Sequence, residues 1–183
     1  MWREIGNYTE EEKSQRLKTY LKFIFVREPL HRLFSAYKDR LVVHSFKYRS
    51  VLKEIVQALR PDKLDPKGNN VVTFPEFIQY YSDNKTRNQH WRQYEKLCHP
   101  CVINYDFIGH LETLEEDAAL LLKMAGIDER VTFPPIYNST GSSEVLQYFS
   151  KVPSEYITRI GEQYRSDFEM FGHEYLGPVK ELL

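Results

Sequence analysis

The sequence of 183 residues lacks several features that would each point to a class of protein. No apolar run approaches the ~20 residues needed to cross a bilayer, and residues 1–12 are polar and acidic, unlike a signal peptide. Positive charge is not in excess, because 25 Lys and Arg residues balance 26 Asp and Glu residues to a net charge of −1. The chain therefore has no basic field for nucleic acid, and we expect no nucleic-acid partner.

Cysteine is scarce as well, with Cys98 and Cys101 alone, which excludes a small domain built on many disulfides. By contrast, 42% of the residues are hydrophobic, and 13 Tyr and 11 Phe make aromatic side chains abundant. This composition is typical of a packed globular protein and argues against disorder. Residues 1–183 have an ordinary length for one domain and are predicted to form a single domain.

Asn7, Asn84 and Asn138 each begin an Asn-X-Thr sequence, which is the acceptor pattern for N-glycosylation. Three such sequences favour a glycoprotein of the secretory lumen. The membrane anchor or signal that this location requires would then be missing from residues 1–183.

The apolar pattern of the first half predicts one strand followed by helices. Residues 22–27 form a short apolar run bounded by charge, typical of a buried strand of a parallel sheet. Pro29 opens a predicted helix, a second covers residues 48–59, and a third starts at a capping box, Thr73–Glu76. The helix at Pro29 has a buried stripe formed by Leu30, Leu33, Phe34, Tyr37 and Leu41.

The second half of the chain continues the alternation. Residues 101–107 are predicted to form a second strand, and a capping box at Thr113–Glu116 begins a helix that Gly126 ends. The C-terminal part is expected to form a long helix whose core side contains Tyr156, Ile160, Tyr164, Phe168 and Phe171. Strands that alternate with helices indicate an α/β fold, with a mostly parallel sheet flanked by helices.

Arg27 and Ser35 are the first candidate ligand-binding residues. Arg27 ends the predicted strand, where ligands bind in sheets of this kind, and Ser35 lies on the helix that follows. A guanidinium group can donate two parallel hydrogen bonds to a phosphate, and a hydroxyl can add a third. The spacing alone also permits an ordinary solvated Arg27 and a Ser35 without function.

The segment from Arg27 to Tyr37, R-E-P-L-H-R-L-F-S-A-Y, resembles the 3′-phosphate-binding motif of sulfotransferases that use 3′-phosphoadenylyl sulfate (PAPS). It is most similar to the Golgi carbohydrate branch, which includes chondroitin, dermatan, GalNAc-4-O and HNK-1 sulfotransferases. Residues 88–91, 97–101 and 105–113 resemble a second conserved block of this branch. The resemblance implies a P-loop-like sulfotransferase fold, with Arg27 and Ser35 holding the 3′-phosphate of PAPS and no metal.

The resemblance also implies an activity, an acceptor and a location. The expected reaction transfers sulfate from PAPS to a sugar hydroxyl, with O4 of GalNAc in chondroitin or dermatan as the first choice of acceptor. The expected partners are the donor nucleotide and a glycosaminoglycan or N-glycan, in the Golgi lumen, as part of a single-pass type II membrane protein. Alternatives are an HNK-1-type glucuronic acid acceptor, and a catalytically dead remnant that binds nucleotide or glycan.

One part of the donor site of this family has no counterpart in the sequence. Members of the family hold the 5′-phosphosulfate in an N-terminal phosphate loop, and residues 1–21 contain no Gly- or Ser-rich loop with a Lys. We therefore expect an N-terminally truncated, partial sulfotransferase domain with weak donor affinity and little activity. A fragment is the favoured explanation, and a splice form or a degenerate paralogue are the alternatives.

His90 is the candidate catalytic base, because histidine is suited to accepting a hydroxyl proton near neutral pH. Trp91 beside it is expected to stack on a sugar ring, and Arg87 and Arg92 are expected to form the rim of the acceptor site. Asp106 and Glu112 are secondary polar candidates. The alternative is that His90 and Trp91 are structural and pack beneath a loop.

Cys98 and Cys101 allow three interpretations. A redox pair is disfavoured, because the cysteines precede a predicted strand instead of following one. A zinc site with His90, His99 and His110 has loose spacing and no second Cys pair. A structural disulfide suits an oxidising lumen, but its connectivity stays open.

Overall fold

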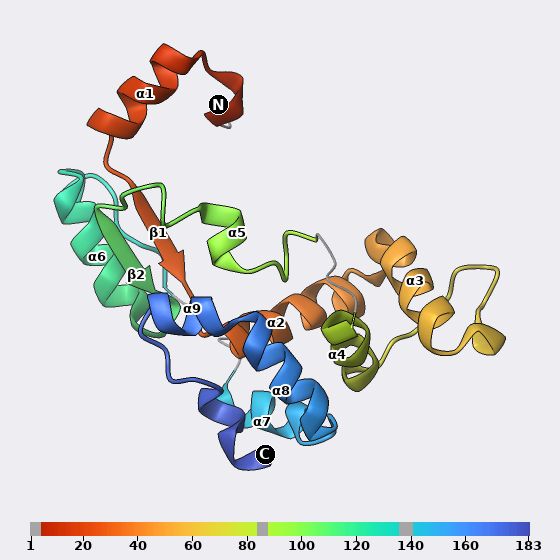
Figure 1. Cartoon of the computed structure of the whole chain (residues 1–183). Helices are drawn as coiled ribbons and strands as arrows, with labels where there is room; N and C mark the ends of the chain where they lie inside the picture. Colours follow the sequence, from red (N-terminus) through yellow and green to blue (C-terminus); the bar gives the residue numbers. More distant parts are fainter. Residues whose placement is uncertain (1–4, 84–87, 136–140) are drawn as a thin grey trace. The chain divides into compact units, whose positions relative to one another are not determined.

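The structure is a computed structural model of the chain, and it describes residues 5–83, 88–135 and 141–183 (Figure 1). The chain forms two compact units. Unit 1 contains residues 1–27 and 98–137, and unit 2 contains residues 28–97 and 138–183. Because two compact units can belong to one domain, the single-domain prediction stays a prediction.

Unit 1 is built on a pair of parallel strands with a helix against it. The strands pair from Phe23 with Phe107 to Val26 with His110, and α6 contacts β2 (Figure 1). The parallel pairing and the adjoining helix agree with the predicted α/β class. The elements of unit 1 are η1 (Ile5–Asn7), α1 (Glu10–Thr19), β1 (Phe23–Val26), β2 (Phe107–His110), η5 (Leu111–Thr113) and α6 (Leu114–Met124).

Gly109 in β2 allows the Phe25 side chain to approach the backbone of β2 closely. A Cβ atom at this position would lie 2.5 Å from the ring of Phe25 in β1, closer than van der Waals contact permits. The absence of a side chain at Gly109 therefore lets the Phe25 ring lie over β2.

The strand predicted at residues 101–107 is wrong for all but its last residue, because β2 begins at Phe107. The preceding residues form a turn, in which the backbone N–H groups of Val102 and Ile103 both donate to the carbonyl of His99. His99 has φ 48°, which reverses the chain here. These local hydrogen bonds satisfy the backbone without a sheet partner.

The capping box predicted at Thr113–Glu116 is also wrong. The Thr113 hydroxyl donates to Oδ2 of Asp117 at 2.7 Å and makes no capping hydrogen bond to the backbone. The predicted end of α6 is confirmed, because Gly126 follows the C-cap residue with φ 65°, the left-handed conformation that favours glycine.

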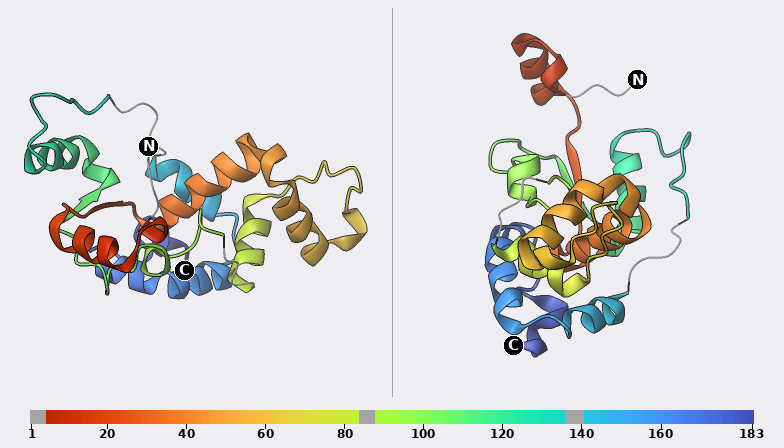
Figure 2. Two further views of the ribbon diagram at one scale, coloured as in Figure 1. Left: turned by 90° about the horizontal axis from the view of Figure 1, so that it is seen from above. Right: turned by 90° about the vertical axis from the view of Figure 1, so that its right-hand side faces the viewer.

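Unit 2 consists of helices, and α4 and α8 lie side by side within it (Figure 2). Pro29 begins the first helix as predicted, and the Thr73–Glu76 capping box is confirmed, with Thr73 N–H donating to Glu76 at 2.8 Å. The elements are α2 (Pro29–Tyr37), the π-helix η2 (Lys38–Val43), η3 (Ser45–Tyr48), α3 (Arg49–Leu59), η4 (Pro61–Lys63), α4 (Phe74–Asp83), α5 (Tyr94–Cys98, its last residue in unit 1), α7 (Ser142–Phe149), α8 (Ser154–Gln163), α9 (Arg165–Met170) and η6 (Gly177–Leu182).

An aromatic core fills unit 2. The Phe74 ring lies edge-on to the rings of Phe34 and Phe149, with centroids 5.4 and 4.9 Å apart. The stripe predicted for the helix at Pro29 is confirmed, because all five of its residues are buried. Burial of this apolar surface is the main source of stability in such a core.

The long C-terminal helix predicted from the sequence is instead three helices, α7, α8 and α9. The break between α7 and α8 contains Pro153, which cannot donate a backbone hydrogen bond inside a helix. A second break falls at Tyr164, with φ −101° and ψ 8°. The predicted core side is buried at four of its five positions, and Tyr156 is half-buried. No helix in the described ranges combines the length and apolar character needed to cross a membrane.

Candidate functional site

Arg27 follows β1 directly, at the carboxyl edge of the parallel pair in unit 1. Val26 pairs with His110, so Arg27 and the segment after His110, including Glu112, lie at the same edge. Arg27 is half-buried and Glu112 is exposed. Ligands of parallel sheets bind at this edge, so the position agrees with a phosphate-binding role for Arg27.

Asp106 lies at the opposite end of the same strands and has a structural role. Its Oδ2 accepts hydrogen bonds from the backbone N–H of Lys22 at 2.8 Å and from Nζ of Lys22 at 2.6 Å. These hydrogen bonds lower the pKa of the Asp106 carboxyl. The carboxylate therefore joins the beginnings of the two strands, away from the edge that holds Arg27.

Asp117 joins the end of β2 to α6 at the carboxyl edge. Its Oδ2 accepts from the backbone N–H of His110 and from the Thr113 hydroxyl, both at 2.7 Å. The backbone hydrogen bond from His110 is the main cause of the lowered pKa of Asp117. The ionised carboxylate holds the segment between β2 and α6 in place.

Ser35 lies on α2 in unit 2. Glu28 caps this helix by accepting from His31 N–H at 2.7 Å, and Pro29 occupies its first turn. Ser35 is half-buried, and no hydrogen bond of its hydroxyl is recorded within the described residues. The hydroxyl can therefore donate to a ligand. The boundary between the units falls between Arg27 and Glu28, so the joint role of Arg27 and Ser35 stays a prediction.

The π-helix η2 follows α2 directly, and π-helical turns are frequent at functional sites. Beside it, the Tyr48 hydroxyl is hydrogen-bonded to Nε2 of His90 at 2.8 Å, with the donor set by the imidazole tautomer. The Arg40 guanidinium lies 5.8 Å from the centre of the Tyr48 ring, and its Nε is 2.9 Å from a carboxylate oxygen of Asp39. Together Asp39, Arg40, Tyr48 and His90 form what we call the His90 cluster.

The electrostatic surroundings of His90 favour its neutral form. Burial lowers the pKa of the imidazole below its usual 6.5, and the positive charge of Arg40 lowers it further. A neutral imidazole can accept a proton, so the chemistry of His90 suits a general base.

The segment that carries His90 is fixed to the core of unit 2. Nη1 of Arg32 donates to the carbonyl of Arg92 at 2.7 Å, and its guanidinium lies 4.3 Å from the centre of the Tyr94 ring. The fully buried Asp167 carboxylate accepts from the N–H groups of Tyr94 and Glu95 at 2.8 and 3.1 Å, and burial raises its pKa. The backbone that follows His90 therefore has defined partners.

Trp91 is a core residue, and the prediction that it stacks on an acceptor sugar is corrected. Its side chain is 2% exposed, and its ring lies edge-on to Phe77 at 5.3 Å. Its carbonyl accepts hydrogen bonds from the hydroxyls of Tyr81 and Tyr164. Trp91 therefore has the structural role that the sequence left as an alternative, while His90 remains half-buried.

Several predicted sites are not decided by the structure. Arg87, Asn84 and Asn138 lie outside the described residues. Arg92 is half-buried, and its role at an acceptor rim stays a prediction. Asn7 is exposed in η1, as a glycosylation site requires.

The same holds for the cysteines. Cys98 ends α5 and is half-buried, whereas Cys101 is exposed in the following turn. The pairing of Cys98 and Cys101 stays a prediction.

The sequence analysis did not single out two residues of this region, Tyr48 and Asp167. Tyr48 is 42 residues from His90, and no sequence pattern pairs them. Asp167 did carry a signal, because it lies between Tyr164 and Phe168 on the core side of a predicted helix. A carboxylate in such a position is rarely buried without partners, which indicates a structural hydrogen-bond acceptor.

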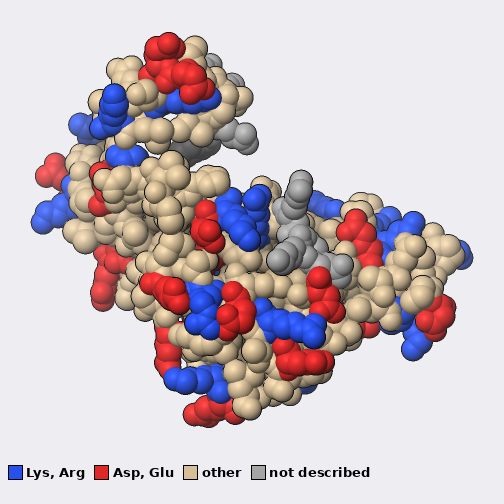
Figure 3. All heavy atoms as spheres, in the orientation of Figure 1, with Lys and Arg blue, Asp and Glu red and all other residues tan. Residues whose placement is uncertain are grey.

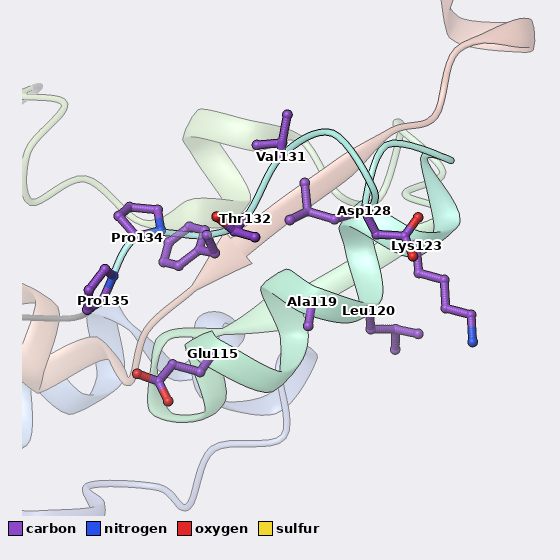
Figure 4. Close-up of a pocket in the computed structure, with 11 residues that line it drawn as sticks. Glu115, Ala119, Leu120, Lys123, Asp128, Val131, Thr132, Pro134 and Pro135 are labelled. Carbon is purple, nitrogen blue, oxygen red and sulfur yellow. The ribbon is translucent and has the colours of Figure 1, made fainter.

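A pocket of about 600 Å³ lies in unit 1 between α6 and the segment after it (Figure 4). Its walls are largely apolar, with Leu120, Val131, Phe133 and Pro134 among them. An apolar lining does not suit a phosphate, so this pocket is separate in character from the edge that carries Arg27.

Comparisons with known proteins relate the sequence of this chain to sulfotransferases. Residues 1–175 match the family described as "Sulfotransferase family". The chain is 39% identical over 186 aligned residues to carbohydrate sulfotransferase 12 of Xenopus laevis, covering 94% of this chain and 44% of that protein. It is 37% identical to carbohydrate sulfotransferase 11 of Rattus norvegicus (92% and 51%) and 35% identical to carbohydrate sulfotransferase 10 of Homo sapiens (93% and 51%).

These matches define the class of the protein. The chain belongs to the sulfotransferase family, and the family resemblance of its motifs is confirmed. It spans about half the length of these curated relatives. No solved structure matches the chain.

Proposed function

We propose that this chain acts in the transfer of sulfate from PAPS to a sugar hydroxyl, with Arg27 and Ser35 as ligands of the 3′-phosphate. One observation carries the proposal: Arg27 ends a parallel strand at the edge where ligands bind, and the chain continues into a helix on which Ser35 has an available hydroxyl. A guanidinium and a hydroxyl together provide the donors that a phosphate dianion needs. The named relatives are carbohydrate sulfotransferases, which supports a sugar as acceptor.

His90 is the proposed base. The acceptor oxygen forms a bond to sulfur while the bond from sulfur to the 5′-phosphate oxygen breaks, and the hydroxyl proton must be taken up. Nε2 of His90 is hydrogen-bonded to Tyr48, and within the described residues Nδ1 has no recorded partner. We therefore assign proton acceptance to Nδ1. For the part of the protein that binds PAPS we propose the P-loop-like fold that the family resemblance implies.

The acceptor we propose is GalNAc, sulfated at O4 in a chondroitin- or dermatan-type chain, with an HNK-1-type glucuronic acid as the alternative. Arg92 and Arg87 are the proposed rim residues. The proposed location is the Golgi lumen, within a type II membrane glycoprotein, and Asn7, Asn84 and Asn138 support a secretory location.

Calorimetric titration with 3′,5′-ADP, the desulfated form of PAPS called PAP, tests the donor site. We expect Arg27→Ala to abolish measurable binding and Ser35→Ala to weaken it by at least about tenfold, as for loss of one hydrogen bond to a charged group. Arg159→Ala and Ser50→Ala are matched controls on exposed helix positions of unit 2 and should bind like the original chain. Unchanged binding by Arg27→Ala, or no binding by the unaltered chain, would contradict the proposal.

A second candidate function is nucleotide binding without turnover. It requires only donors for the 3′-phosphate, the role proposed for Arg27 and Ser35, whereas sulfate transfer also requires groups that bind the 5′-phosphosulfate. A turnover assay with PAPS and chondroitin separates the two: sulfate transfer supports the enzyme, and PAP binding without transfer supports the second function.

A further inference from the structure

A polar pocket of about 470 Å³ lies in unit 2, where α3 ends. Arg60, Lys63, Asn69 and Glu76 are among the residues that line it. This volume falls within the ~300–1,000 Å³ typical of small-ligand sites. Its position and lining distinguish it from the apolar pocket of unit 1.

The frame of the pocket is held by hydrogen bonds. Nε of Arg60 donates to Oε1 of Glu76 at 2.6 Å, and Nη2 of Arg60 donates to the carbonyl of Val71 at 2.5 Å. The Asn70 carboxamide is buried and accepts from the N–H of Asp65 at 3.0 Å. The walls are therefore ordered before any ligand binds.

Other polar groups that line the pocket are available to bind a ligand. Lys63 and Asn69 are exposed, and within the described ranges neither the Lys63 ammonium nor the Asn69 carboxamide has a recorded hydrogen bond or ion pair. An ammonium group and an amide suit a ligand that carries both an anionic group and hydroxyl groups. An acidic sugar, with a carboxylate or sulfate beside its hydroxyls, has this chemistry.

The helix α3 connects this pocket to the His90 cluster. Tyr48 precedes α3 and Arg60 follows its last residue, so eleven helical residues, about 16 Å of helix, separate the two ends. Arg49 and Lys53 lie on one face of α3 at i, i+4 spacing, and both are exposed. A monosaccharide cannot reach both ends of this face, whereas several linked sugars can.

The charge of this region differs from that of the whole chain. Residues 47–67 contain six basic residues, Lys47, Arg49, Lys53, Arg60, Lys63 and Lys67, against three acidic ones, Glu54, Asp62 and Asp65. The net charge of the segment is therefore 6 − 3 = +3, while the whole chain has −1. Figure 3 shows Lys and Arg side chains over the α3 region on one face, with fewer acidic side chains among them. Such a segment attracts a polyanion.

We infer that the pocket at the end of α3 is a distal subsite for an acidic sugar of the same glycan chain whose hydroxyl is presented to His90. This inference rests on the proposed function, since it takes the His90 cluster as the acceptor site. Lys63 and Asn69 bind the distant sugar, and Arg49 and Lys53 bind anionic groups between the two ends. The subsite gives longer acidic glycans a higher affinity than short ones.

The test is calorimetric titration of the chain with size-defined unsulfated chondroitin, as a disaccharide and as an octasaccharide. We expect the octasaccharide to bind at least tenfold more tightly. Lys63→Ala and Lys53→Ala should each weaken octasaccharide binding by about fivefold, as for loss of one exposed ion pair, and should leave the affinity for PAP unchanged. Equal affinity for both lengths, or octasaccharide binding that neither variant weakens, overturns the inference.

Two controls make the result specific. Lys151→Ala removes an exposed lysine of unit 2 outside residues 47–67 and should not alter octasaccharide binding. A neutral chito-octaose should not bind more tightly than a neutral disaccharide, and a length effect with this glycan contradicts recognition of acidic groups. If the proposed donor site is wrong, the unaltered chain will not bind PAP, while the length effect for chondroitin will persist.

Discussion

The two units of this chain are built in different ways. In unit 2, Phe77 is 1% exposed and Trp91 is 2% exposed, within one aromatic cluster. In unit 1, Phe23 is 52% exposed and Ile108 is 42% exposed, on strands whose ends are joined by polar contacts such as Lys22 to Asp106. Unit 2 therefore draws its stability from burial, and unit 1 depends more on a few hydrogen bonds.

As a result, the residues of the proposed site are supported in different ways. Ser35 and His90 are carried by helices and segments anchored to a well-packed core, while Arg27 is carried by the open parallel pair. Side chains supported by a packed core keep their geometry better than those on sparsely packed elements. We therefore expect substitutions in unit 2 to affect folding and those in unit 1 to act locally.

The largest expected effect is on the core of unit 2. Phe77→Ala should lower the free energy of unfolding by about 3–5 kcal/mol, because it leaves a cavity beside Tyr81 and Trp91. Phe23→Ala is the matched change in unit 1 and should cost below about 1 kcal/mol, since this ring is half exposed. Urea unfolding followed by circular dichroism measures both. Equal losses in the two variants would remove the distinction between the units.

The next effect concerns the buried carboxylate of unit 2. Asp167→Ala should cost about 2 kcal/mol, because the N–H groups of Tyr94 and Glu95 lose their acceptor in a buried setting. Asp167→Asn keeps one acceptor oxygen and should lose less. The same unfolding measurement applies, and an unchanged midpoint for Asp167→Ala would show that this carboxylate does not anchor the segment.

A smaller loss is expected where the strands of unit 1 meet. Gly109→Ala places a Cβ against the Phe25 ring, and displacement of that ring should cost about 1–2 kcal/mol. Adding Phe25→Leu to Gly109→Ala should recover part of the loss, because a smaller side chain leaves room for the Cβ. Full stability of the single variant would contradict the close packing of the Phe25 ring on Gly109.

The smallest effect is a shift in one titration. NMR titration should place the pKa of His90 below its usual 6.5, and Arg40→Ala should raise it, because a positive charge that disfavours the imidazolium is removed. With the folded-state pKa lowered, the stability contributed by neutral His90 is present above pH 6.5 and is lost as pH falls through the lowered value. Arg159→Ala should leave the titration unchanged, and a pKa at or above 6.5 in the unaltered chain contradicts the account.

Local patterns predicted much of the fold. The elements from Phe23 to Leu41 were correctly predicted because strand, proline and helical stripe are all local signals. The strand at residues 101–107 was misplaced because a turn at His99 satisfies the backbone there. The C-terminal helix was predicted as continuous because its stripe keeps helical spacing across Tyr164, where the backbone does not.

The candidate site was less predictable than the fold. An aromatic residue of the core and an aromatic residue that stacks on a ligand look the same in a sequence. Trp91 was therefore predicted to stack on a sugar, although it lies in the core. The contact between Tyr48 and His90 joins residues distant in sequence and arises only from the packing of unit 2. Local motifs predicted His90 as a candidate base, which stays a prediction, and the tertiary structure shows its hydrogen-bond partner Tyr48.

The most direct test of the central claim is a crystal structure of the chain bound to PAP. Our account predicts the 3′-phosphate within hydrogen-bonding distance of both the Arg27 guanidinium and the Ser35 hydroxyl. A nucleotide bound elsewhere, or a 3′-phosphate held by neither side chain, would contradict it.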